Sequence, residues 1–339
     1  MILVTGASGL LGGNLLWYLL QENEQVVALK RSSSNLTALH TIFSFYTDDP
    51  DSFLKKIIWR DADITDFEAL SKVFDDIDTV YHCAAVISLK NGSKSMIDSN
   101  VQGTKNIVEL CLQNKIGKLC FVSSIAACGT TNDGSLIDEY TTGLKRQKSA
   151  YSISKFAAEQ EVWQAIEKGL NAVIVNPGVI MGISGTESGS AKIFTEVKKG
   201  LMFYTAGING YVDVRDVARI MILLTKSDIC GERFILVSEN CSHKTVFHTI
   251  AEAFGVRKAR ICVGEKLIFT AGIIMEFISK FIGKEPIFDR DMGKSATAKD
   301  LYSNAKIKQF INYEFLSVRQ SIEDICGFLG KNQNGRPLC

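Results

Sequence analysis

A glycine-rich turn near the start of the chain constrains the fold more than any other sequence feature. In "ILVTGASGLLGGNLLWYLL" three glycines stand three residues apart, between an apolar run and an amphipathic stretch. Glycine permits the positive φ of a tight turn, and the N-terminus of a following helix offers free N–H groups to phosphate. The spacing differs from GxGxxG, but strand, turn and helix follow in the order of a dinucleotide-binding unit. We expect these residues to bind the phosphates: Gly6, Ser8, Gly9, Leu10 and Leu11.

Short apolar runs alternate with amphipathic stretches through the first 180 residues. Strands that are buried on both faces and separated by helices predict an α/β fold with a doubly wound parallel sheet of the Rossmann type. A further strand is expected at residues 233–238, after a helical pattern at 214–227. The six earlier strands are expected at residues 2–6, 25–29, 56–64, 79–85, 118–124 and 172–178.

The rest of the chain has a different pattern. Residues 181–210 are rich in Gly and Ser and read as irregular, whereas residues 241–330 are mostly helical with weak turn signals. We expect a dinucleotide-binding domain at 1–180, completed by 211–240. The segments 181–210 and 241–330 would form a smaller, mostly helical substrate-binding lobe with a largely apolar pocket, and 331–339 a flexible tail.

Charge and cysteine usage exclude several classes of function. The 38 Lys and Arg balance 37 Asp and Glu, so no net field attracts nucleic acid or an anionic membrane, and a small-molecule substrate is expected. The nine cysteines form no CxxC pair and have no His cluster nearby, which indicates reduced core thiols and no metal site. "MILVTGASG" has no basic region or cleavage site, so we expect no signal peptide and a cytoplasmic protein.

One apolar segment, "LIFTAGIIMEFISKFIG" at residues 267–283, raises the question of a membrane. It is interrupted by Glu276 and Lys280 and is shorter than the roughly 20 residues that a span requires. We expect no membrane span. A helix packed on the lobe is favoured over attachment at the membrane interface.

The end of the second strand indicates which dinucleotide binds. An NAD site would place an acidic side chain here for the ribose 2′-hydroxyl, but this chain has Lys30 and Arg31, followed by three serines. A guanidinium can bind a 2′-phosphate that a carboxylate would repel. NADP(H) is therefore favoured and NAD(H) stays open, and a solvated basic turn is the alternative reading.

The ends of the third and fourth strands continue the cofactor path. "RDADITD" would place Asp63 and Ile64 beside the adenine. In "HCAA", Cys83 precedes two small residues, Ala84 and Ala85, which would let a cofactor pass over the sheet edge. Either motif alone is no more than a strand end; together they support a dinucleotide site.

"SAYSISKFAAE" places Tyr151 four residues before Lys155 in a helical pattern. Residues four apart lie on one face of a helix, so both can point at one ligand. By itself the pair favours a half-buried aromatic and a solvated charge.

With the preceding motifs, however, the chain resembles the extended short-chain dehydrogenases/reductases of the NAD-dependent epimerase/dehydratase family over about residues 1 to 330. The motifs are TGASGLLG, DADITD, HCAA, DSNVQGTKN, FVSSIAACG, YSISK, NPGVIMG and VDVRDVA. Of its branches, those of dihydroflavonol 4-reductase and 3β-hydroxysteroid dehydrogenase are the most similar.

The resemblance implies roles for five residues. Tyr151 would be the general acid, its pKa lowered by the ammonium of Lys155 and by the oxidised nicotinamide. Lys155 would also hold the ribose hydroxyls of the nicotinamide side. Ser124 would stabilise charge on the substrate oxygen. Asn100 would anchor a water or backbone group behind Lys155, or serve only as a helix cap. Pro177 would position the nicotinamide carboxamide.

Some positions depart from the family pattern. Cys128 stands where many relatives have a pocket-lining tyrosine, Asn176 where many have arginine, and Met181 where sugar enzymes often have an aromatic residue. Because of these departures, the substrate of a relative cannot be assigned to this chain. Many relatives dimerise through the helices that flank the active-site helix; apolar residues there fit a homodimer, and core packing explains them equally well.

Three functions are compatible with these motifs. The leading one is an NADP(H)-dependent oxidoreductase that reduces a ketone to a secondary alcohol, or the reverse, on a moderately apolar small molecule. The second is a nucleotide-sugar epimerase or dehydratase with bound NAD, for which the chain offers few diphosphate anchors. The third is an NADP-sensing regulator without turnover, against which the intact Ser–Tyr–Lys set argues.

Overall fold

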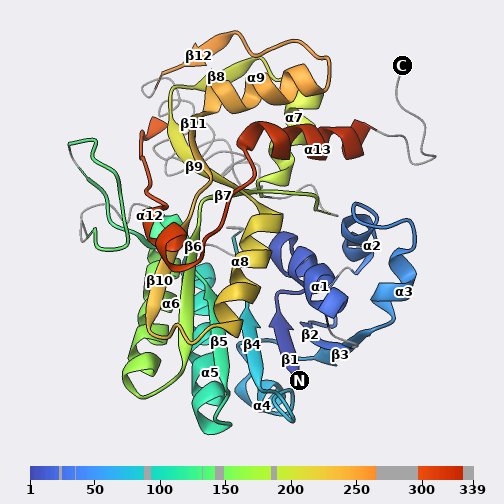
Figure 1. The fold of residues 1–339 in the computed structure, drawn as a ribbon, viewed down its shortest axis with the longest axis vertical. Helices are drawn as coiled ribbons and strands as arrows, with labels where there is room; N and C mark the ends of the chain where they lie inside the picture. The colour runs from blue at the N-terminus through green and yellow to red at the C-terminus, as the bar shows by residue number, and fades with distance from the viewer. Residues whose placement is uncertain are drawn as a thin grey trace, which may run out of the picture.

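A parallel seven-stranded sheet forms the centre of the molecule (Figure 1). The computed structural model describes residues 1–22, 25–34, 36–87, 93–131, 133–141, 149–184, 189–264 and 297–330. The strand order is β10-β6-β5-β4-β1-β2-β3. All seven strands predicted from the sequence are present: β1 (Ile2–Thr5), β2 (Val26–Lys30), β3 (Ile57–Asp61), β4 (Thr79–His82), β5 (Lys118–Val122), β6 (Ala172–Pro177) and β10 (Glu232–Leu236).

Helices cover both faces of this sheet, which confirms the doubly wound fold. Leu3 and Val4 are both fully buried, but Leu3 packs in the apolar cluster of one face and Val4 in that of the other. Strands covered on both faces cannot alternate apolar and polar residues, hence the continuous apolar runs. One face carries α1 (Leu10–Glu22), α2 (Thr37–Phe43), α3 (Pro50–Leu54) and α8 (Val214–Lys226); the other carries α4 (Phe67–Ser71), α5 (Ser93–Gln113) and α6 (Ala150–Glu167).

The sheet has its topological switch between β1 and β4. The chain builds outward from β1 through β2 to β3 and then returns to the other side of β1 with β4. Thr5 and His82, the last residues of the two strands, are paired in register. In open α/β sheets, ligands bind at the carboxyl ends of the strands at such a switch.

A smaller lobe stands beyond these carboxyl ends (Figure 1). Its own apolar core includes Phe194, Ile250 and Ile322. The expectation that residues 181–210 are irregular is wrong, because they contain an eight-residue helix and a short strand, and the lobe has strands as well as helices. The elements are β7 (Val179–Met181), α7 (Ala191–Lys198), β8 (Phe203–Thr205), β9 (Ile208–Asp213), β11 (Glu239–Ser242), α9 (His243–Ala253), β12 (Ile261–Val263) and α13 (Val318–Gly330). The short helix α12 (Ala305–Phe310) packs instead on β10 at the edge of the main sheet.

An arginine on α8 ties the lobe to the main sheet. Arg215 donates to the Asp213 carboxylate through two guanidinium nitrogens, at 2.9 and 2.8 Å, and pairs with Asp324 of α13 through the third at 2.8 Å. On the same helix, the carboxylate of Asp216 accepts hydrogen bonds from the Tyr313 hydroxyl at 2.8 Å and the Leu316 backbone N–H at 2.9 Å. These contacts fix the segment that leads into α13 against α8.

The predicted apolar segment at 267–283 and the predicted tail at 331–339 lie outside the described residues. Among the residues that are described, no helix is both long and apolar enough to cross a membrane. Cys111, Cys120 and Cys326 are buried free thiols, as expected for core cysteines, but Cys230 and Cys262 are exposed.

Candidate active site

The glycine turn joins β1 to α1 in a conformation that only glycine tolerates well. Gly6 has φ +66°, and a Cβ there would lie 2.7 Å from the backbone nitrogen of Ala84. A Cβ on Gly12 would lie 2.2 Å from the Gly6 carbonyl oxygen, so α1 could not pack on the turn. The N–H of Gly9 donates to the Gly6 carbonyl at 3.0 Å. The turn therefore lies against Cys83 and Ala84, the residues that follow β4, and α1 begins directly after it.

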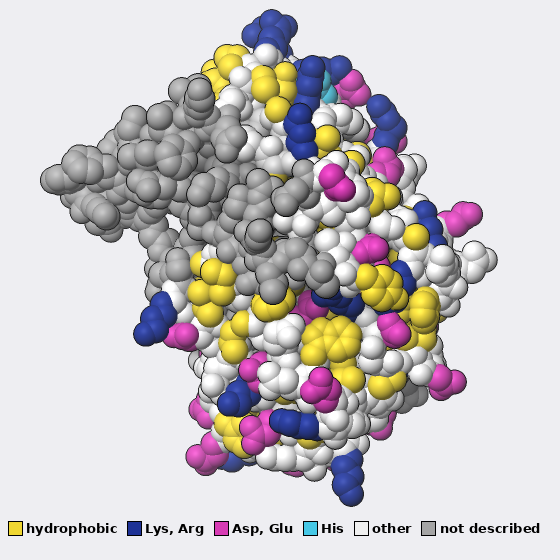
Figure 2. All heavy atoms as spheres, turned by 90° about the vertical axis from the view of Figure 1, so that its left-hand side faces the viewer, with side chains coloured by type: hydrophobic (Ala, Val, Ile, Leu, Met, Phe, Trp, Pro, Cys, Tyr) yellow, Lys and Arg dark blue, Asp and Glu magenta, His cyan; other side chains and the backbone are white. Residues whose placement is uncertain are grey.

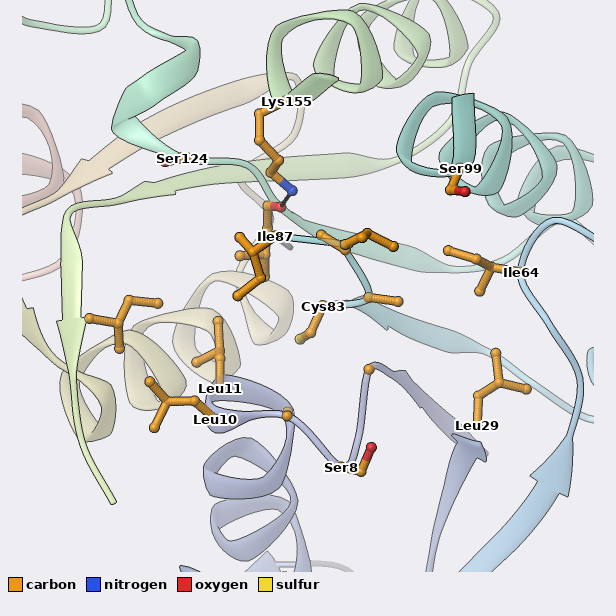
Figure 3. A pocket seen from close by; sticks show the side chains of 18 of the residues that line it. Ser8, Leu10, Leu11, Leu29, Ile64, Cys83, Ile87, Ser99, Ser124 and Lys155 are labelled. Carbon is orange, nitrogen blue, oxygen red and sulfur yellow. Dashed lines mark hydrogen bonds between the residues drawn. The ribbon is translucent and has the colours of Figure 1, made fainter. Parts of the chain in front are cut away.

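A first cavity of about 470 Å³ opens at this edge (Figure 3). Figure 3 shows Ser8, Leu10 and Leu11 along one side of it and Lys155 across from them. Every predicted site residue except Asn100 lines it: Gly6, Ser8, Gly9, Leu10, Leu11, Lys30, Arg31, Asp63, Ile64, Cys83, Ala84, Ala85, Ser124, Tyr151, Lys155 and Pro177. Sequence reasoning missed other lining residues, among them Leu29, Ser34, Ala62, Thr65, Val86, Ile87, Ser99, Ser123 and Ser190. Of these, Ser34 had a signal, because it is the last serine of "KRSSS".

The basic end of this cavity differs from the sequence prediction in one respect. The Lys30 ammonium forms an ion pair with Asp61, the last residue of the neighbouring strand β3, at 2.8 Å. Arg31 is exposed at the cavity wall, and its backbone N–H donates to the Ser34 hydroxyl at 3.0 Å. Arg31 is therefore better placed than Lys30 to meet a phosphate, since the charge of Lys30 is already compensated.

Asp63 organises the loop after β3. Its carboxylate accepts from the backbone N–H of Thr65 at 2.9 Å and from the Thr65 hydroxyl at 2.7 Å. Burial by itself would raise the pKa of Asp63, but these bonds and the charge of Arg31 lower it below its ordinary value. The carboxylate is thus ionised and turned toward its own loop.

Tyr151 and Lys155 lie one turn apart on α6, whose N-terminus is fixed by a capping box. The Ser149 hydroxyl accepts from the Ser152 N–H at 3.1 Å, and the Ser152 hydroxyl accepts from the Ser149 N–H at 3.2 Å. This cap stabilises the first turn, and with it the position of Tyr151. Ser124 follows β5 and caps the short helix at Ile125–Ala127.

Burial shifts the pKa values of both members of the pair. Burial raises the pKa of Tyr151, and a hydrogen bond with Ser124 opposes this shift. The Lys155 ammonium donates to the backbone carbonyl of Val122 at 2.6 Å and lies 5.0 Å from the ring centre of Phe121. Burial lowers the pKa of Lys155 to about 8. The ammonium is therefore directed at the end of β5, and Ser124 is the group that offsets burial at the phenol.

A buried carboxylate one turn further along α6, Glu159, holds the end of β5 in place. The Glu159 side chain is 1% exposed and accepts from the Ser123 hydroxyl at 2.5 Å and the Asn176 amide at 2.9 Å. The same Asn176 amide group donates to the Ser124 carbonyl at 3.0 Å. Arg233 on β10 supplies the counter-charge at 3.0 Å. Tyr151, Lys155 and Glu159 thus share a helix face against β5, and the sequence analysis did not single out Glu159 or Arg233.

Asn100 has a supporting position and does not line the first cavity. It lies within α5, so it is not the helix cap that was considered. Its side-chain oxygen accepts from the Val86 N–H at 2.7 Å, and its amide donates to the Val86 carbonyl at 2.9 Å and to the Ser154 hydroxyl at 3.0 Å. Asn100 therefore joins the loop after β4 to the residue next to Lys155.

A second cavity of about 600 Å³ adjoins the first and extends toward the lobe. Ser124 and Tyr151 line both cavities. Cys128 lines the second, whereas Met181 packs in the core of the lobe. Asp300 is the one residue with a formal charge among the described residues that line it. The lobe contributes Val179, Gly189, Ser190, Ile208, Asn209, Thr297, Ala298, Asp300 and Tyr302, and none of residues 241–264.

The first cavity fits a dinucleotide. Its glycine turn leaves no room for a Cβ at two positions, and the first residues of α1 line it. It reaches from Arg31, after β2, across β1 and β4 to Tyr151, beside the end of β5. Gly6, Ser8 and Gly9 would hold the pyrophosphate.

Comparison with known proteins agrees with this geometry. The sequence profile described as NAD dependent epimerase/dehydratase family matches residues 2–235. A putative dihydroflavonol 4-reductase of Synechocystis sp. is 29% identical over 95% of this chain and 92% of its own length. Cinnamoyl-CoA reductase 1 of Petunia hybrida is 25% identical over 95% of this chain and 90% of its own length.

Solved structures show the same fold. The UDP-glucose 4-epimerase of Thermus thermophilus, in complex with NAD, superposes with a TM-score of 0.73 at 22% identity, over 97% of this chain and 99% of that one. The matched profile covers both the glycine turn and the Tyr151–Lys155 pair, and it ends within β10. The chain therefore belongs to the NAD dependent epimerase/dehydratase family.

Proposed function

We propose that this NAD(P)-dependent enzyme is an NADP(H)-dependent oxidoreductase that reduces a ketone to a secondary alcohol, or catalyses the reverse, on a moderately apolar small molecule. The observation that carries the proposal is that Ser124 and Tyr151 line both cavities. A cofactor in the first cavity and a substrate in the second would meet at these two hydroxyl groups. Residues 181–210 and 241–330 would form the substrate-binding lobe.

The chemistry divides between the cofactor and the side chains. The nicotinamide would supply or accept the hydride. In the reducing direction the Tyr151 phenol gives its proton to the carbonyl oxygen, and the Ser124 hydroxyl donates a hydrogen bond to the same oxygen as charge develops there. Lys155 and Pro177 would hold the nicotinamide end of the cofactor. NADPH-dependent turnover on a panel of neutral ketones and diketones tests the proposal.

Replacing Ser124 by Ala is expected to lower turnover about 100-fold, as loss of one oxyanion donor does. Ser123→Ala is the matched comparison, because that hydroxyl bonds Glu159. Steady-state kinetics of both variants, with protein folding checked by circular dichroism, measures the difference. Equal losses in the two variants would remove the proposed role of Ser124.

Cofactor choice gives a second test. If Arg31 binds the 2′-phosphate, NADPH raises the unfolding temperature of the protein more than NADH does. The Arg31→Ala substitution is then expected to reduce the difference between the two increases in unfolding temperature. Lys30→Ala is expected to have a smaller effect, since Lys30 is paired with Asp61. A wild-type protein that NADH stabilises more than NADPH would overturn the NADP(H) assignment.

An NAD-containing nucleotide-sugar epimerase or dehydratase is the second candidate. The structural likeness to a UDP-glucose 4-epimerase in complex with NAD favours it. Against it, no lysine or arginine is present among the described residues that line the second cavity, whereas a sugar diphosphate carries two negative phosphates. Tightly held NAD in the purified protein, together with thermal stabilisation by UDP-glucose, would favour this function over a reductase.

A further inference from the structure

Large apolar side chains are exposed at the far end of the smaller lobe. Met202 is 60% exposed, Phe203 45% and Ile261 48%. The pairing of β8 with β12 sets Phe203 opposite Ile261, and the N–H groups of Arg260 and Ile261 both donate to the Met202 carbonyl. Single exposed apolar residues are ordinary, but three that adjoin one another form a patch that calls for an explanation.

Positive charge gathers around these side chains. Residues 190–204 and 241–264 contain seven Lys and Arg but only two Asp or Glu, although the whole chain has 38 and 37. Neither Arg257 nor Arg260 has an ion-pair partner in the part of the chain that the structure describes. Figure 2 shows yellow side chains beside dark blue ones at the top of the molecule, the end that carries β8 and β12 in Figure 1. The seven residues, all exposed, are Lys192, Lys198, Lys199, Lys244, Arg257, Lys258 and Arg260.

The two acidic residues leave most of this charge uncompensated. Glu196 pairs with Lys199 and Glu252 with Lys258. Lys244 lies 5.6 Å from the ring centre of Tyr204, which is paired with Cys262 across the two strands. The surplus therefore lies on α7, on α9 and on the residues that lead into β12; α7 packs on α9, and α9 packs on β8. The net charge of the whole chain gave no reason to expect attraction to an anionic surface.

We propose that this end of the lobe, called here the basic–apolar end and made of β8, β12 and the seven basic residues, binds the surface of an anionic lipid bilayer. Phe203, Met202 and Ile261 would enter the boundary between headgroups and acyl chains, and the lysines and arginines would stay among the phosphates. A nucleic acid would use the cations but not the aliphatic side chains. A second copy of the chain, packed symmetrically, would bring like charges together.

Co-sedimentation of the full chain with vesicles tests this proposal. Vesicles of phosphatidylcholine and phosphatidylserine are expected to retain the protein, pure phosphatidylcholine vesicles to retain little, and added salt to release it. The double variants Phe203→Ser/Ile261→Ser and Arg257→Glu/Arg260→Glu are each expected to lower the bound fraction at least about tenfold at limiting lipid.

The control variants change exposed residues of the same kinds on the larger part of the molecule. Leu223→Ser on α8 and Lys105→Glu on α5 are expected to bind vesicles as the wild type does. Equal binding to both kinds of vesicle, or equal losses in the control variants, would overturn the proposal. So would a dimer, seen by sedimentation velocity, that Phe203→Ser/Ile261→Ser dissociates, or release of the protein from vesicles by polyuridylate at constant ionic strength.

Discussion

Replacing Tyr151 by Phe is expected to lower turnover by at least about 100-fold, and by up to about 10,000-fold, with little change in dinucleotide affinity. The substitution removes one hydroxyl and keeps the ring that packs at the start of α6. Among the described groups that shift the pKa of Tyr151, Ser124 is the one that forms a hydrogen bond with its hydroxyl. The substitution therefore removes a contact between two side chains and leaves the backbone contacts of the site in place. The measurement is single-turnover reduction of a ketone found by screening, together with fluorescence titration of NADPH.

Lys155→Ala is the variant that separates two roles. Its ammonium reaches the Val122 carbonyl and lines the first cavity, so its loss is expected to weaken dinucleotide binding as well as turnover. Because burial lowers the pKa of Lys155 to about 8, wild-type turnover should fall as the pH rises through this value.

Near wild-type turnover in Tyr151→Phe would end the assignment of the phenol as the proton donor.

Replacing Arg233 by Met is expected to lower the free energy of unfolding by about 3–5 kcal/mol, because it removes the ion-pair partner of the buried Glu159 carboxylate. The Glu159 side chain is 1% exposed and Arg233 contacts it at 3.0 Å. Arg233 also donates to the backbone carbonyl of Glu139 at 2.9 Å, which Met cannot replace. Urea denaturation followed by circular dichroism measures the loss.

A double-mutant cycle distinguishes a charge effect from lost packing. Glu159→Gln removes the charge and keeps the shape, so combining it with Arg233→Met should cost less than the two single substitutions added together. Arg233→Lys, which keeps the positive charge but loses the planar fork, should lie between wild type and Arg233→Met. Strict additivity would show that charge pairing is not what makes Arg233 important.

The main sheet was predictable because its signals are local and strong. Each strand is a short apolar run. Glycine is required at position 6 because its φ is positive and because a Cβ there would lie only 2.7 Å from the backbone nitrogen of Ala84. The lining of the first cavity followed, since parallel strands present their carboxyl ends at one edge. These features depend on neighbours in sequence or on the general geometry of the sheet.

The contacts that were missed join distant parts of the chain. The pair of Lys30 with Asp61 depends on the register between β2 and β3, and the pair of Glu159 with Arg233 joins a helix to a strand 74 residues further on. The periodicity of apolar residues along the sequence carries no information about such distant partners. The short elements of the lobe, such as the three-residue β8, are too brief to give a pattern that differs from a loop.

The bridge between Ile137 and Tyr302 bears on how relatives of this protein should be recombined. The Ile137 N–H donates to the Leu301 carbonyl at 2.7 Å, and the Ser303 N–H donates to the Ile137 carbonyl at 2.8 Å. The loop that follows Ser124 and the wall of the second cavity are thus one hydrogen-bonded unit built from opposite halves of the chain. A chimera that exchanges only the C-terminal part would pair a foreign wall with the native loop, so crossover points should move residues 133–141 and 297–303 together.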